Sequence, residues 1–257
     1  WFAKSSHMDK AQLREFLDRK AAQYNRPAFI PEDPIAVPHQ YREREDQEIA
    51  GFLTATIAWG RRPRIVASGH RMMALLDGAP AEFVRTHQPS DLQRLERFVH
   101  RTFQPADFRY FLRSLQRLYR EGDGLRGAFQ GQDAGSAIIH FREAFFQPPH
   151  PLRTQKHVSD PRKNSACKRL NMFLRWMVRQ DRQGVDLGLW DHLQPHQLSL
   201  PLAVHSARVA RRLGLLQRRT TDWKAVREVD AALRRLDSQD PVRYDFALFG
   251  LGIFEAF

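Results

Sequence analysis

The chain has 257 residues, of which 42% are hydrophobic, and a formal net charge of +12. This length and apolar content suit one or two folded domains and exclude a disordered chain. No run approaches the roughly 18 apolar residues that a membrane span requires, and no signal peptide opens the chain, so we expect a cytoplasmic protein that uses no membrane. The positive charge favours a nucleic-acid partner, although an arginine content inflated by a GC-rich genome is the alternative.

Residues 1–7, WFAKSSH, look like an expression remnant, and Met8 is the expected native start. The single cysteine, Cys167, excludes an intramolecular disulfide, a zinc site of paired cysteines and a four-cysteine iron–sulfur cluster. The histidines do not fall at ligand spacings such as HExxH. We therefore expect neither a metal nor another cofactor.

Turn signals divide the first part of the chain into helices. Residues 9–24 carry apolar side chains at helical spacing, and the four prolines between 27 and 38 then predict an extended connector. Aspartates suited to N-caps, Asp91 and Asp107, open two of the next helices. The prolines at 148, 149 and 151 form the clearest linker. The helices predicted after the connector cover 45–59, 64–77, 91–103, 107–121 and 136–147, with at most a short helical piece within 122–135.

The second part of the chain begins with a basic, turn-forming segment, RTQKHVSDPRKN, at 153–164. It directly precedes a strongly amphipathic helix predicted over 165–179. A turn that feeds a helix N-terminus presents free N–H groups, so we expect a phosphate clamp here, with a solvated basic loop as the alternative. Further helices are predicted over 204–213, 222–236 and 241–254, and no strand pattern is present. The predicted fold is therefore all-α.

Two stretches resemble the helix-hairpin-helix DNA glycosylase superfamily. Lys168 opens a helix similar to the lysine helix of archaeal and prokaryotic 8-oxoguanine glycosylases, and PLAVH at 201–205 matches the segment that carries their aspartate. More closely, residues 29 to 255 resemble a bacterial family of conserved proteins of unknown function. The stretches that carry this closer resemblance are DPIAVPHQY, HRTF, KHVSDPRKNSACKRLNMFLRWMVR and YDFALFGLGI.

The resemblance implies a two-lobed helical bundle of the glycosylase type. We expect an N-terminal helix and connector at 8–44, a helical lobe at 45–151 and a hairpin-containing catalytic lobe at 152–257, whose last helices are free to pack with the first lobe. Two departures from the family pattern stand out. Ser159-Asp160-Pro161-Arg162 replaces the Gly-x-Gly of the hairpin, and Ala203 stands where the pattern has aspartate.

Ala203 also falls at the expected N-cap of the helix 204–213. Alanine is a poor N-cap, because it stabilises a helix by about 1 kcal/mol less than aspartate does. We interpret Ala203 as the replacement of a native aspartate, either through deliberate mutation that leaves substrate uncleaved or in a natural inactive paralogue.

The chemistry of base excision explains why a lysine and a carboxylate are expected together. Breaking a base–sugar bond builds positive charge on the sugar, which a carboxylate at a helix N-terminus stabilises. Lys168, as a neutral amine, would attack the sugar carbon if desolvation or the cations Arg169 and Arg175 lower its pKa. The Schiff base that forms permits strand cleavage by β-elimination. Lys163 is the reserve nucleophile, and a phosphate contact or solvent-facing position is the alternative role for Lys168.

Base excision also requires the base to be flipped into a pocket. The resemblance implies Trp59, Asp245 and Phe249 as pocket residues and Gln40 as a reader of the base edge, while core packing is the alternative for both aromatic side chains. His205 is expected to support the turn at position 203. The residues expected to contact DNA are Lys156, His157, Arg162, Lys163, Arg169, His205 and Arg208.

The sequence thus predicts a monomeric, nucleoid-associated DNA glycosylase with β-lyase activity. Its expected partner is double-stranded DNA with a damaged base, 8-oxoguanine first. The alternatives are a glycosylase for another modified base, including a hypermodified base of invading DNA, and a non-catalytic binder of damaged or distorted DNA.

Overall fold

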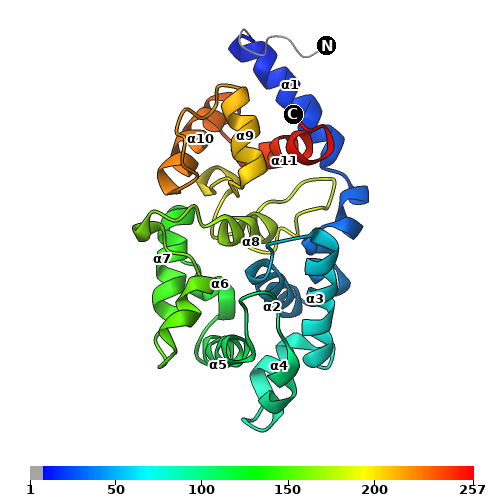
Figure 1. Ribbon diagram of the computed structural model, residues 1–257, viewed down its shortest axis with the longest axis vertical. Helices are drawn as coiled ribbons and strands as arrows, with labels where there is room; N and C mark the ends of the chain where they lie inside the picture. Colours follow the sequence, from blue (N-terminus) through cyan, green and yellow to red (C-terminus); the bar gives the residue numbers. More distant parts are fainter. Residues whose placement is uncertain (1–7) are drawn as a thin grey trace. The chain divides into compact units, whose positions relative to one another are not determined.

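The computed structural model describes residues 8–257, so the expected expression remnant at 1–7 lies outside the described residues. Between 8 and 257 the regular elements are α-helices and short 3-10 helices, with one isolated bridge between His100 and Phe103 (Figure 1). The prediction of an all-α chain is confirmed for this part. Among the described helices, none combines the length and the apolar character needed to cross a membrane.

The helices form two compact units. Unit 1 comprises residues 8–29 together with Pro161–Phe257, and unit 2 comprises Ile30–Asp160. The sequence had instead predicted boundaries after residues 44 and 151. The difference arises because the first helix packs with the last ones, and because the proline-rich segment at 148–151 continues into a turn that belongs to unit 2.

Unit 2 is organised around a cluster of phenylalanines. Phe52 of α2 (Arg44–Thr56) stacks on Phe111 of α5 (Pro105–Glu121), with 5.7 Å between ring centroids. Phe145, at the end of α7 (Ala134–Phe145), meets the Phe52 ring edge-on at 5.7 Å. The other elements of this unit are α3 (Arg62–Leu75), α4 (Pro80–Thr86), α6 (Gly124–Ala128), η2 (Pro34–Ala36), η3 (Pro38–Gln40), η4 (Asp91–Arg97) and η5 (Leu152–His157), and η1 (Pro27–Glu32) spans the boundary with unit 1.

Unit 1 contains five α-helices, and four of them share an aliphatic core. Leu17, Val209, Val229 and Leu248 contribute to this core from four different helices, and all are buried. The helices are α1 (Lys10–Tyr24), α8 (Lys168–Val178), α9 (Val204–Arg212), α10 (Trp223–Leu236) and α11 (Tyr244–Phe254), with the 3-10 helices η6 (Pro161–Lys163), η7 (Pro195–Gln197) and η8 (Pro241–Arg243).

Helix α1 lies beside α11 although the two stand at opposite ends of the chain (Figure 1). Lys20 Nζ donates to Glu255 Oε1 at 2.6 Å, and the Tyr24 hydroxyl donates to the same oxygen. Gly250 permits the close approach, because a Cβ at this position would lie 2.1 Å from the Tyr24 ring. The first helix is therefore a structural part of unit 1.

Most helices predicted from periodicity are present to within a few residues, but two predictions are wrong. The connector at 27–38 is a run of 3-10 helices and not extended, since the φ of proline suits a helical first turn equally well. Only Asp91–Arg97 of the predicted helix 91–103 is helical, as a 3-10 helix, and Phe98 is extended. In addition, α4, which begins at Pro80, had not been predicted.

Candidate functional site

Lys168 is the first residue of α8 and follows a strained turn. Cys167 has a φ of 48° and Asn164 a φ of 59°, so two non-glycine residues within four are left-handed. Each such residue costs on the order of 1–3 kcal/mol and persists only where its surroundings hold it. The buried Asn171 side chain supplies one such restraint, because its Nδ2 donates to Ala166 O at 3.1 Å. The turn thereby fixes the backbone position from which the Lys168 side chain extends.

The same turn is anchored to α10 through Asn164. Its Nδ2 donates to Asp222 Oδ2 at 3.0 Å, and its carbonyl accepts from the Trp223 N–H at 3.1 Å. Asp222 is the N-cap of α10 and accepts from the Ala225 N–H at 3.0 Å. One asparagine therefore ties the start of α8 to the start of α10, 58 positions later.

The Lys168 side chain is partly buried, and its Nζ lies 3.3 Å from Met172 Sδ, one helical turn along α8. A thioether is a weak acceptor, so this contact stabilises an ammonium far less than a carboxylate would. Burial lowers the pKa of the adjacent Arg169 to about 10. Arg169 is half-buried, and it stands next to Lys168 in the first turn of the helix.

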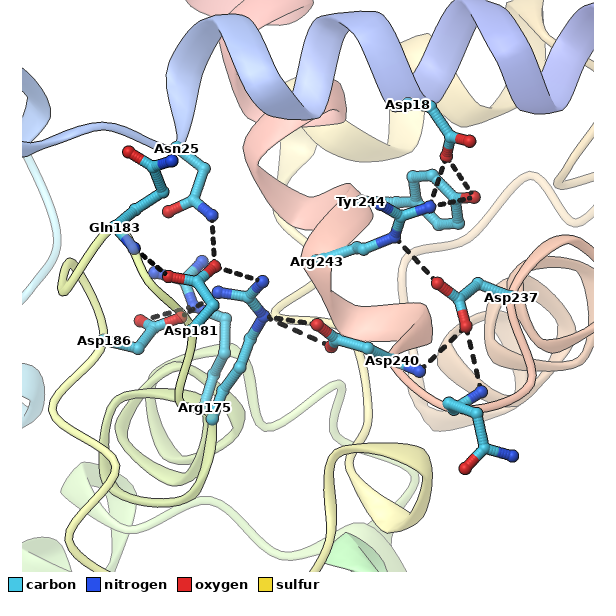
Figure 2. Close-up of polar contacts among 12 residues, drawn as sticks. Asp18, Asn25, Arg175, Asp181, Gln183, Asp186, Asp237, Asp240, Arg243 and Tyr244 are labelled. Atoms are coloured by element: carbon cyan, nitrogen blue, oxygen red, sulfur yellow. Dashed lines mark hydrogen bonds and ion pairs between the residues drawn. The ribbon is translucent and has the colours of Figure 1, made fainter.

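Arg175, which the sequence suggested as a second cation acting on Lys168, has a different position. It is buried, its Nε lies 3.1 Å from Asp186 Oδ1, and its Nη1 donates to Asp245 (Figure 2 shows Arg175 and Asp186). Its guanidinium also lies over the Phe246 ring, 4.4 Å from the centroid. Two carboxylates thus compensate the charge of Arg175, which corrects the expectation that it tunes the lysine.

The four residues expected to line a base pocket are divided between the units. Asp245 is in unit 1, buried on Arg175, and Phe249 is half-buried there, edge-on to Phe29 with 5.9 Å between centroids. Trp59 is in unit 2, and its ring stacks on His157 at 6.2 Å. Gln40 is exposed at the end of η3, also in unit 2. Asp245 and Phe249 come one helical turn apart on α11, as expected.

Ala203 is the N-cap of α9, where the sequence placed it. Its backbone is extended, with φ −110° and ψ 174°, and no side chain caps the helix. Two hydrogen bonds hold the segment before Ala203 against α10. The Leu200 N–H donates to Asp230 Oδ1 at 2.9 Å, and Arg234 Nη2 donates to Leu198 O at 2.9 Å. The backbone at Ala203 is therefore already shaped for a capping side chain that alanine does not supply.

The first turn of α9 is unusually open. Val204, directly after the cap, is 76% exposed, and His205 and Arg208 are also exposed. Arg208 Nη2 donates to Gly252 O at 3.1 Å, which leaves the rest of its guanidinium available. A Cβ at Gly252 would lie 3.1 Å from the Cβ of His205, so α9 and α11 pack closely at this point.

The basic segment expected to bind phosphates is divided at the unit boundary. Lys156 is exposed in unit 2, and Arg162 and Lys163 are exposed in unit 1. His157 differs from these, because its side chain is buried and its Nε2 lies 3.1 Å from Asp107 Oδ2. This burial corrects the expectation that His157 contacts DNA, since the ring is enclosed by its own unit.

Asp107 is the centre of a buried network and not the N-cap predicted for α5. It lies in the first turn of the helix and accepts from Thr154 Oγ1 at 2.8 Å and from Arg153 Nη1 at 2.6 Å, in addition to His157. Burial alone would raise the pKa of Asp107, but hydrogen bonds from His157, the Gln104 N–H and Thr154 outweigh it and hold the pKa far below its usual range. The network fixes the 152–157 segment on α5.

The comparisons with known proteins identify one family. Residues 33–254 match the model of a family described as protein of unknown function, DUF2400. The chain belongs to this family. No curated protein matches the DUF2400 chain, and no solved structure does. Within residues 8–257 of this family member, no group of three or more histidine, cysteine, aspartate or glutamate side chains is arranged to hold a metal ion.

Sequence reasoning missed three residues that shape the candidate site of this DUF2400 protein. Asn164 and Asp230 hold the turns before Lys168 and Ala203, and Asp107 holds the basic segment. Asn164 carried a local signal, because asparagine tolerates the left-handed conformation better than most residues. Asp230 carried another, because a carboxylate among the apolar positions of α10 indicates a buried acceptor.

Proposed function

We propose that the chain is a DNA glycosylase with associated β-lyase activity, acting on a damaged base in double-stranded DNA, with 8-oxoguanine as the first candidate. The observation that carries the proposal is a pair of helix starts within unit 1. Lys168 begins α8 after a turn held in left-handed conformations, and Ala203 occupies an N-cap whose backbone suits a carboxylate. Ala166, two positions before Lys168, packs against the apolar cluster that contains Leu202 and Ala207, which lie one position before and four positions after Ala203.

In the proposed reaction the neutral Nζ of Lys168 attacks C1′ of the deoxyribose. The glycosidic bond breaks, and its electron pair leaves with the base, which takes up a proton. The sugar ring opens to an iminium between Nζ and C1′, loss of a C2′ proton then expels the 3′ phosphate by β-elimination, and water finally releases the lysine. A carboxylate at position 203 would stabilise the positive sugar and accept a proton, so alanine is expected to impair these steps.

Exposed cations near both helix starts support binding to a polyanion. Arg162 and Lys163 stand before α8, and Arg208 stands one turn into α9. These side chains suit phosphate contacts, which give affinity without base specificity. The exposed Val204 is the first residue of α9, and exposed apolar side chains at DNA-binding surfaces can enter a distorted duplex. This last feature also suits the second candidate, a non-catalytic binder of distorted DNA.

Borohydride trapping on a duplex with one 8-oxoguanine tests the proposal, comparing the chain with its Ala203→Asp variant. A covalent adduct that appears or strengthens in the variant, and disappears when Lys168→Arg is added, supports the lysine mechanism. If neither form gives an adduct or releases a base from a panel of modified duplexes, the glycosylase proposal fails. Retained duplex binding with a silent Lys168→Arg change would then favour the non-catalytic binder.

A further inference from the structure

A polar cavity of about 440 Å³ lies within unit 1, beside the second half of α1 (Figure 2). We refer to it as the α1 cavity. Its walls come from three segments, namely α1 with its C-cap, the loop after α8, and the turn between α10 and α11. The lining residues are Asp18, Ala21, Ala22, Asn25, Arg179, Asp181, Arg182, Gln183, Asp237, Asp240 and Arg243.

Asn25 presents an unsatisfied acceptor in this wall. Its side chain is 8% exposed, and its Nδ2 donates to Asp181 Oδ2 at 2.6 Å, whereas its Oδ1 has no hydrogen-bond partner. Reversing the amide would place its oxygen against the carboxylate, so the hydrogen-bond network fixes the orientation. A buried amide oxygen left without a donor is unfavourable. The cavity therefore favours an occupant that donates a hydrogen bond at this point.

Carboxylates outnumber the guanidiniums in the wall, with four aspartates against three arginines. Asp181 and Asp240 share Arg179, with N–O distances of 2.7 and 2.9 Å. Arg179 also pairs with the buried Asp186 at 3.2 Å. A second guanidinium, Arg243, is shared in the same way by Asp18 and Asp237.

The other cations nearby do not offset this excess, because Arg175 pairs with Asp186 and Asp245, which both lie outside the lining. Arg182 is exposed at the rim, and Arg14 is an exposed partner of Asp18 at 3.8 Å. Burial raises the pKa of Asp240, and the neighbouring Asp237 raises it further, against the lowering effect of Arg179 and Arg243. Asp240 is thus incompletely compensated. An additional positive charge in the cavity would be stabilised most strongly beside it.

We infer that the α1 cavity binds a short aliphatic primary ammonium. The ammonium would donate to Asn25 Oδ1 and lie between Asp181 and Asp240, and the alkyl chain would lie along Ala21 and Ala22 of α1. The volume is at the small end of the range for ligand sites, roughly 300–1,000 Å³, which suits a ligand of a few heavy atoms. Carboxylates on several sides disfavour an anion. This site is independent of the proposed excision chemistry, because it involves neither Lys168 nor Ala203.

Isothermal titration calorimetry of the full chain with n-butylammonium chloride tests this inference, with 1-butanol as the uncharged control at matched ionic strength. We expect saturable binding of the ammonium and none of the alcohol. Asp240→Asn removes one carboxylate, and Ala22→Phe fills the cavity from an exposed helical position that should not disturb folding. Each change should weaken binding about tenfold or more, while the surface change Glu121→Gln, which alters net charge equally, should not.

Three results would overturn the inference. One is the absence of saturable heat at any ammonium concentration, which would indicate a cavity filled by water alone. Another is equal binding of 1-butanol, and the third is equal weakening by Glu121→Gln and Asp240→Asn. Thermal unfolding of each variant shows whether it is folded. If Asp240→Asn does not fold, Ala22→Phe still tests the inference. The measurement uses no DNA, so its failure leaves the glycosylase proposal untouched.

Discussion

The carboxylate of Asp230 on α10 accepts a hydrogen bond from the backbone N–H of Leu200, three residues before the N-cap position of α9. Asp230 is 4% exposed, and burial raises its pKa to about 6, although the Leu200 N–H, Ser199, Arg234 and Arg227 all act to lower it. A buried, titrating group therefore positions the segment that leads to Ala203. We therefore expect the stability of unit 1 to depend on pH through this carboxyl.

Asp230→Asn should abolish the pH dependence that this carboxyl contributes to stability. A carboxyl with a higher pKa in the folded state binds more protons when folded, so its contribution is full below pH 4 and is lost as pH rises through 6. Asparagine keeps an acceptor for Leu200 but does not titrate. The free energy of unfolding of the variant relative to the native chain should therefore rise by up to about 3 kcal/mol between pH 4 and pH 7.

Urea unfolding at a series of pH values measures this difference. Asp237→Asn is the matched control, because burial would raise the pKa of Asp237 but the N–H groups of Asp240 and Gln239 lower it overall. The free energy of unfolding of Asp237→Asn relative to the native chain should fall as the pH rises, opposite to the change for Asp230→Asn. A difference for Asp230→Asn that does not vary with pH would contradict the buried, protonated carboxyl.

Ala203→Asp should stabilise the fold as well as restore chemistry. The backbone at 203 is already extended, so a carboxylate can accept from the free N–H groups of the first turn and favour the positive end of the helix dipole. We expect a gain of about 1 kcal/mol in the free energy of unfolding. Ala203→Asn separates the two effects, because it caps equally well without a charge. Asparagine should raise stability without giving a borohydride-trapped adduct, and an adduct with asparagine would exclude the carboxylate role.

Asp107→Asn should destabilise unit 2 by about 2–3 kcal/mol, because a buried charged acceptor with three side-chain partners is lost. Chemical denaturation monitored by helical circular dichroism measures the loss. Arg153→Ala is the control, since this partner is 41% exposed and its ion pair is screened by solvent. The control should cost under about 1 kcal/mol. Equal losses in the two variants would show that the buried network contributes no more than a surface pair.

The elements of the candidate site that the sequence predicted are local ones. Apolar spacing located the helix that Lys168 opens, and the predicted start of the helix 204–213 put Ala203 at its N-cap, because such signals act within one or two turns of a helix. The contacts that fix these positions, such as Asn164 with Asp222, join residues far apart in sequence, and no local pattern encodes them.

The unit boundary illustrates the same limit. The prolines at 148, 149 and 151 predicted a domain boundary there, whereas packing places the boundary between Asp160 and Pro161. The assignment of the first helix to the C-terminal unit depends on the fit of the Tyr24 ring against Gly250, which is a tertiary contact.

Asp245→Asn distinguishes the two roles that this residue has been given. If Asp245 serves chiefly to compensate the buried Arg175, its loss leaves a charge with one remaining carboxylate, Asp186, and should lower the free energy of unfolding by about 3 kcal/mol. If it reads a base, the variant should unfold normally but excise different bases in the Ala203→Asp background. Thermal unfolding and excision assays on a panel of modified duplexes measure the two effects separately. A variant of native stability with altered base selection would overturn the structural role, because asparagine changes the hydrogen bonds offered to a base without leaving a cavity.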